Sequence, residues 1–135
     1  MLFRSLTITI QHLTNAECGD LAVTAAEGGI NYWADTDEYD WTRWQDKETG
    51  DAKDIPDDFP FYVIWDKEDN TLPKTAVTPE TFRRGMELLM GERYRDIAVA
   101  RWFASNDRDE WNCADADAAD VLIQLGIFEI GRAHV

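Results

Sequence analysis

Residues 27–33 read Glu-Gly-Gly-Ile-Asn-Tyr-Trp and gather several chemically useful side chains at the end of a predicted helix. Adjacent glycines let a backbone approach a ligand closely, and an aromatic ring can stack on a flat base. The amide of Asn31 could read the polar edge of such a ring. This pattern predicts a binding surface for a flat, polar small molecule, and it matches no known catalytic signature.

Glu27 is unusual because an acid in the last turn of a helix opposes the helix dipole. Such a residue is often held in place by a partner or by a ligand. The sequence leaves two interpretations open, a binding role and a structural ion pair. The arginines that could form the ion pair are Arg83, Arg84 and Arg101.

Asp120 and Gln124 lie four residues apart in the last predicted helix and therefore share one of its faces. Both are polar where simple packing favours apolar residues. We expect them to join one polar cluster with Glu27 and Asn31 at the end of the first helix. The predicted ligand-binding residues are Glu27, Gly28, Gly29, Asn31, Tyr32, Trp33, Asp120 and Gln124.

Metal sites are weakly indicated. Asp115 and Asp117 would lie in the first turn of the last helix and would suit Mg²⁺, although acids there also stabilise the helix dipole. Asp35 could begin an EF-hand loop, but its sixth and twelfth positions would hold Asp40 and Asp46 instead of glycine and glutamate. The sequence predicts no cofactor.

Nucleophilic catalysis has little support. His12 is the only histidine before residue 129, and neither Cys18 nor Cys113 has a recognisable acid–base context. No phosphate-binding glycine motif is present. We therefore expect a binding protein rather than an enzyme, with a carboxylate-dependent metal hydrolase as an alternative.

The composition sets the class of protein. The chain has 135 residues, 44% of them hydrophobic, which predicts one folded domain. Its net charge of −14 disfavours direct binding to nucleic acid or to an anionic membrane. The two cysteines and the lack of a signal peptide or long apolar stretch indicate a cytoplasmic protein.

Most of this charge lies between Asp35 and Asp69, a segment that contains thirteen acidic residues and four basic ones. A solvated surface that keeps the protein soluble is one interpretation. The other is mimicry of a nucleic-acid backbone, with the tryptophans among the acids as interface anchors.

The predicted elements give an α+β fold, a small antiparallel sheet of about four strands with three to four helices packed on one face. Alternation predicts a strand at 6–10, and a capping box at Thr14 begins a helix that Gly28 would end in the left-handed conformation. Further strands are predicted within 30–44, at 59–66 and at 71–77, and further helices at 78–90, 92–104 and 115–125.

The last residues, 129–135, read Glu-Ile-Gly-Arg-Ala-His-Val, which a common short-read sequencing adapter encodes when translated. We expect this tail to be non-native, which makes 1–128 the single domain and points to a metagenomic assembly.

Residues 24–33 and 115–128 together resemble a family of small, functionally uncharacterised proteins encoded by tailed phages and prophages. In that family the final segment continues from the phenylalanine into a Gly-Glu-hydrophobic-Val-Tyr-Gly ending, which this chain lacks from Phe128 onward. The resemblance implies a viral protein acting in the host cytoplasm, and it implies no activity.

Three functions follow as hypotheses. The first is a non-enzymatic counter-defence protein that sequesters a small host signalling molecule, such as a nucleotide, in a pocket completed by an arginine and by formation of a homo-oligomer. The second is an acidic nucleic-acid mimic that inhibits a host protein. The third is the metal hydrolase.

Overall fold

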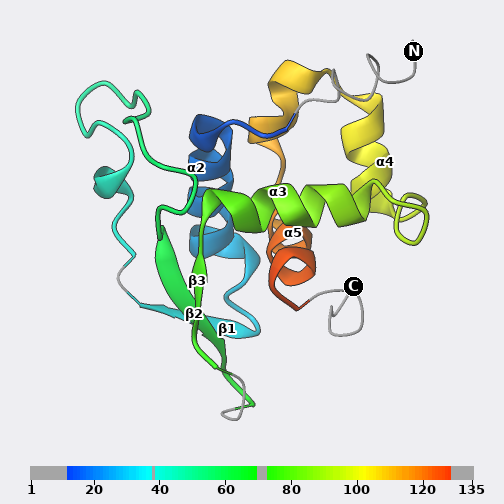
Figure 1. Cartoon of the computed structure of the whole chain (residues 1–135), viewed down its shortest axis with the longest axis horizontal. Helices are drawn as coiled ribbons and strands as arrows, with labels where there is room; N and C mark the ends of the chain where they lie inside the picture. Colours follow the sequence, from blue (N-terminus) through cyan, green and yellow to red (C-terminus); the bar gives the residue numbers. More distant parts are fainter. Residues whose placement is uncertain (1–11, 38, 70–72, 129–135) are drawn as a thin grey trace.

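The computed structural model describes residues 12–37, 39–69 and 73–128 and has an α+β fold (Figure 1). The strand predicted at 6–10 and the tail at 129–135 lie outside these residues. The helices are α2 (Asn15–Thr24), α3 (Pro79–Leu89), α4 (Ala98–Ser105) and α5 (Ala116–Phe128). A π-helical turn (Ala25–Gly29) extends α2, and two 3-10 turns span Trp41–Arg43 and Arg108–Cys113.

The described sheet has three antiparallel strands in the order β1 (Ala34–Asp37), β2 (Tyr62–Asp66) and β3 (Thr75–Val77). Burial alternates along it: Tyr62 and Ile64 are buried, whereas Val63 and Trp65 are partly exposed. The Tyr62 hydroxyl donates to the Ala22 carbonyl at 2.7 Å and so ties the sheet to α2. Four strands were predicted, and the fourth, at 6–10, falls among the residues not described.

Two helices begin at the capping residues that the sequence predicts. The Thr14 hydroxyl accepts from the Glu17 amide at 3.1 Å while the Glu17 carboxylate accepts from the Thr14 amide at 2.8 Å, which is the predicted capping box. Thr78 and Pro79 begin α3 as predicted. Within the described residues, no helix has both the length and the apolar character needed to span a bilayer.

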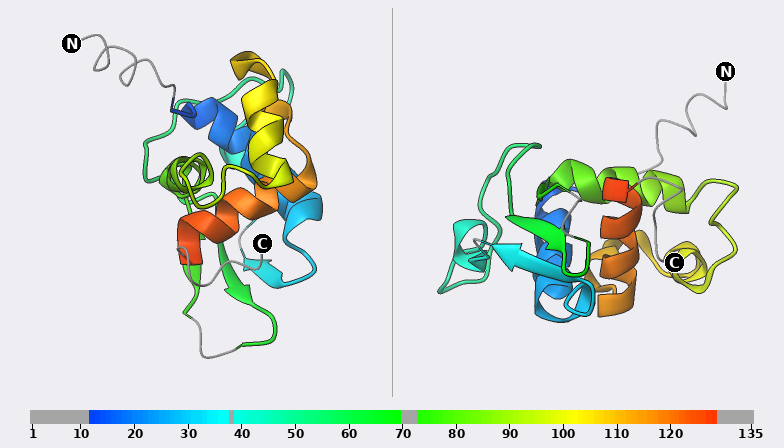
Figure 2. Two further views of the ribbon diagram at one scale, coloured as in Figure 1. Left: turned by 90° about the vertical axis from the view of Figure 1, so that its right-hand side faces the viewer. Right: turned by 90° about the horizontal axis from the view of Figure 1, so that it is seen from below.

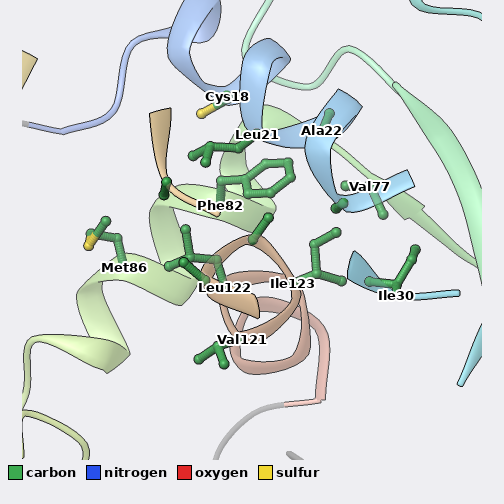
Figure 3. Close-up of a cluster of buried hydrophobic side chains, with 14 of the residues drawn as sticks. Cys18, Leu21, Ala22, Ile30, Val77, Phe82, Met86, Val121, Leu122 and Ile123 are labelled. Atoms are coloured by element: carbon green, nitrogen blue, oxygen red, sulfur yellow. The ribbon is translucent and has the colours of Figure 1, made fainter. Parts of the chain in front are cut away.

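The core lies where α2, α3 and α5 meet (Figure 3). Leu21, Phe82 and Leu122 are fully buried there. Helices α3 and α5 cross at backbone contact, because a Cβ on Gly85 would lie 2.1 Å from the Leu122 carbonyl oxygen. A Cβ on Gly126 would meet the Thr81 carbonyl oxygen at the same 2.1 Å. Glycine is therefore required at both positions by this close approach.

Three sequence predictions were wrong in detail. Gly28 does not end α2 in a left-handed conformation, since Gly50 alone among the described glycines has a positive φ. One long, bent strand or two short ones were predicted within 30–44, whereas the described residues of this range form the short strand β1 and a 3-10 turn. The Asp40 carboxylate starts that turn by accepting from the Thr42 amide. Residues 92–97 form consecutive turns instead of the first part of a helix.

Candidate functional site

A buried carboxylate joins the end of α2 to α5. Asp120 is 6% exposed and accepts from the Trp33 indole at 2.7 Å and from the Tyr32 hydroxyl at 2.8 Å. The Gln124 amide, one turn along α5, donates to Asp120 at 2.9 Å and to the Tyr32 oxygen at 3.2 Å. We call these four side chains the polar joint. The two motifs meet, but through Tyr32 and Trp33 and not through Glu27 and Asn31 as predicted.

Backbone packing adds to the polar joint. A Cβ on Gly29 would lie 2.7 Å from the Ala116 carbonyl oxygen, whereas one on Gly28 would have only the Ala116 Cβ, 3.9 Å away. Trp33 is buried and its ring packs against Phe128, with centroids 5.3 Å apart. Gly29 and Trp33 therefore have a structural role, because their contacts pack the end of α2 against α5.

Tyr32 has a different position from the rest of the polar joint. Its side chain is 68% exposed although its hydroxyl is bonded to Asp120. Partial burial and that hydrogen bond raise the pKa of the Tyr32 hydroxyl. A raised pKa keeps the hydroxyl neutral and makes it a poor nucleophile, so the arrangement suits an oriented ring more than a reactive oxygen.

Glu27 and Asn31 lie outside the polar joint. Glu27 is exposed and accepts a 2.5 Å hydrogen bond from the Tyr39 hydroxyl, whose pKa is raised by burial and by this bond. Asn31 is also exposed, and its carbonyl accepts from the Lys67 ammonium at 2.5 Å. The contact with Tyr39 satisfies Glu27 at the helix end, and no local sequence signal predicts it.

Arg83, one of the arginines considered for Glu27, lies elsewhere. Arg83 donates to the Leu13 carbonyl at 2.7 Å, to the Asn15 side chain and, at 3.3 Å, to Asp57. These contacts are at the start of α2, whereas Glu27 follows its end (Figure 1). An open hollow of about 560 Å³ adjoins this arginine, and its lining residues are His12, Asp57, Glu80, Arg83, Arg84 and Glu87. The interpretation of Glu27 as the ion-pair partner of Arg83 is therefore wrong.

Of the two residues considered for a metal, Asp115 has a structural contact. The Asp115 carboxylate accepts from the Ala118 amide at 2.9 Å and caps α5, while Asp117 is exposed. In the described part of the chain no group of three or more His, Cys, Asp or Glu side chains is placed to hold a metal ion.

The acidic segment 35–69 contains two kinds of carboxylate. Some form turns: Asp46 accepts from the Glu48 and Thr49 amides, and Asp66 accepts from the Glu68 and Asp69 amides. An aspartate followed by polar residues is a known signal for such turns, and it could have been read from the sequence. The exposed carboxylates that have no partner within the described residues are Asp35, Asp37, Glu48, Asp51, Asp54, Asp58 and Glu68.

No protein-family model, curated protein or solved structure matches this chain in comparisons with known proteins.

Proposed function

We propose that this protein is a non-enzymatic binding protein whose acidic segment docks on a basic surface of a partner protein. The observation that carries the proposal is the set of exposed, unpartnered carboxylates between Asp35 and Glu68. A carboxylate that forms a turn or caps a helix has a structural reason to be present. Those that have no such contact are free to meet a cationic partner.

The shape of the segment supports docking. Residues 45–54 form a loop that extends from the body formed by the helices (Figure 1), and the chain returns to the core at Ile55. Its base is held by Lys53, which donates from its amide to the Trp44 carbonyl at 2.9 Å and from its ammonium to the Thr42 carbonyl at 2.8 Å. Trp44 is buried, and its indole donates to the Gly19 carbonyl at 3.1 Å. The loop is thus anchored to α2 while its acids face solvent.

The net charge of −14 would steer the protein toward a basic surface and away from nucleic acid itself. Because the sequence resembles phage proteins, we propose a host protein with a nucleic-acid-binding groove as the partner. The protein would occupy that groove in the host cytoplasm and inhibit it, which is a counter-defence role.

The test compares two neutralised variants of equal charge. In the first, Asp35, Asp37, Asp51, Asp54 and Asp58 become Asn. In the second, Glu87, Glu92, Asp96, Asp109 and Glu110, which are also exposed, become the matching amides. Host proteins retained by the wild type are identified by mass spectrometry, and each is purified and titrated with duplex DNA in competition.

The proposal predicts that duplex DNA and the wild type compete for the same partner and that only the first variant loses binding. Equal loss in both variants would show that net charge alone is responsible. Retention of the partner by the first variant, or indifference to DNA, would contradict the proposal.

A second candidate function, sequestration of a small planar molecule, is favoured by the exposed ring of Tyr32. Asp120 and Gln124 fix the orientation of that ring, and an oriented ring is a suitable stacking platform. Native mass spectrometry of protein purified from infected cells tests it. A retained small molecule that Tyr32→Phe keeps and Tyr32→Ala loses would support this function, and its absence from all three proteins would contradict it.

A further inference from the structure

Side chains on the partly exposed face of the sheet form two rows across its strands. Asp35 on β1 lies opposite Trp65 on β2, and Lys74, just before β3, places its ammonium 4.5 Å from the centroid of the Trp65 ring. In the next row Asp37 lies opposite Val63, and Val63 opposite Ala76. Each row therefore has a carboxylate on β1 and an apolar side chain on β2. The first row ends at the Lys74 ammonium and the second at Ala76.

Within the part of the chain that the structure describes, the two carboxylates in these rows lack a cationic partner, whereas the one lysine lies over an aromatic ring. Lys74 sits over Trp65, which shows that this ring already accepts a cation from within the chain. Asp35 and Asp37 are exposed and have no hydrogen-bond or ion-pair partner among the described residues. Facing strand residues have Cβ atoms about 5 Å apart, so Asp35 is close to the Trp65 ring. A second cation beside β1 would meet the Asp35 and Asp37 carboxylates and would compete with Lys74 for the Trp65 ring.

Strand β1 also lies at a border of the sheet. The described strands have the order β1-β2-β3, so β1 pairs with β2 on one side, and no described strand pairs with its other side (Figure 2). A border strand offers backbone donors and acceptors to an incoming chain. A second copy of this chain is a poor match, because β1 against β1 would set carboxylate beside carboxylate.

We propose that β1 receives an extended segment of the partner protein that carries lysine or arginine at alternate positions, as an added strand. This inference rests on the proposed function and names the surface that performs it. Side chains of a strand alternate between faces, and Asp35 and Asp37 are about 6.8 Å apart along β1. Alternate basic residues of the added strand therefore lie beside these two carboxylates, while its backbone bonds to β1.

The experiment uses two acetylated and amidated hexapeptides of equal composition. In one, lysine and threonine alternate, and in the other three lysines precede three threonines. Binding is measured by isothermal titration calorimetry at low salt, and protection of the β1 amides by hydrogen exchange. The proteins are the wild type, Asp35→Asn/Asp37→Asn, the loop control Asp51→Asn/Asp54→Asn, and Lys74→Gln.

The wild type should bind the alternating peptide more tightly than the blocked one and gain protection at the Thr36 amide, which faces away from β2, whereas the Ala34 amide already donates to the Ile30 carbonyl. Asp35→Asn/Asp37→Asn should weaken binding about fivefold to tenfold, as expected for two lost surface ion pairs, and the loop control by less than about twofold. Lys74→Gln should strengthen binding, because it removes a competing cation from Trp65.

Three results would overturn the inference. If both peptides bind equally and only the loop control loses binding, the border strand is not the site, although the proposed function stands. If the wild type binds neither peptide, the inference about β1 fails, and the competition with duplex DNA decides the proposed function separately. If Asp35→Asn/Asp37→Asn self-associates and still binds the peptide, the two acids serve only to prevent pairing between the β1 strands of two copies of the protein.

Discussion

Asp120 and Asp35 are the same residue type in opposite situations. Asp120 is buried in the polar joint, and its two carboxylate oxygens accept hydrogen bonds from Tyr32, Trp33 and Gln124. Asp35 is exposed on the sheet and has no partner among the described residues. A buried carboxylate needs such donors to remain in the core, whereas an exposed one has no need of any.

The contrast changes which part of the molecule is the better candidate for function. The run at residues 27–33 has the side chains of a binding site, yet folding accounts for Gly29, Trp33 and their contacts with α5. The acidic segment has an unremarkable composition for a soluble surface, yet it holds the carboxylates that folding does not use. Whether a side chain is bonded within the chain therefore distinguishes structural residues from candidate binding residues better than its residue type does.

The largest expected effect is on the polar joint. Asp120→Ala leaves the Trp33 indole and the Gln124 amide without their acceptor, and we expect it to lower the free energy of unfolding by about 3 kcal/mol. Asp120→Asn keeps an acceptor oxygen and should lower it by only about 1 kcal/mol. Urea unfolding measures both, and an Asp120→Ala variant as stable as the wild type would contradict the assignment.

The two adjacent glycines give a matched pair. Gly29→Ala forces a Cβ to 2.7 Å from the Ala116 carbonyl oxygen and should cost about 2 kcal/mol through overpacking. Gly28→Ala meets nothing closer than 3.9 Å and should change stability by less than about 0.5 kcal/mol. Thermal unfolding of the two variants checks this order, and equal effects would show that the contact with Ala116 is unimportant.

The pKa of Tyr32 makes the polar joint sensitive to alkaline pH. This pKa is raised in the folded state above its ordinary value of 10.0. The corresponding stabilisation is complete below pH 10.0 and is lost as the pH rises through the folded pKa. The difference in unfolding free energy between the wild type and Tyr32→Phe should therefore shrink above that pH in urea titrations. A constant difference from neutral to alkaline pH would argue against the bond to Asp120.

The smallest effect on stability belongs to the sheet. Asp35→Asn/Asp37→Asn removes no partner contact and should change the free energy of unfolding by less than about 0.5 kcal/mol. Loss of more than about 1 kcal/mol in urea unfolding would mean that these acids, like Asp120, serve the fold.

Local chemistry was predictable from the sequence where neighbours along the chain decide it. The capping box at Thr14, the start of α3 at Thr78 and the last helix depend on residues within one turn of each other. The spacing of Asp120 and Gln124 also predicted a shared face, and their polarity predicted contact with the end of α2. Their partners there are Tyr32 and Trp33 instead of the predicted Glu27 and Asn31.

Long-range contacts decided what could not be predicted. Gly29 is glycine because the Ala116 carbonyl lies against it, and Glu27 is held by Tyr39 from another segment. Turns at 92–97 repeat every three residues, as the amide-to-carbonyl bonds of Tyr94 to Gly91 and of Ile97 to Tyr94 show. This spacing is close to the helical period, so the apolar pattern did not distinguish turns from helix.

Titration of the alternating lysine–threonine peptide into Asp120→Asn and Asp35→Asn/Asp37→Asn tests the central distinction most directly. If the polar joint serves the fold and β1 serves binding, Asp120→Asn binds within about twofold of the wild type and Asp35→Asn/Asp37→Asn binds about fivefold to tenfold more weakly. Loss of binding in Asp120→Asn, with binding retained by Asp35→Asn/Asp37→Asn, would contradict the account.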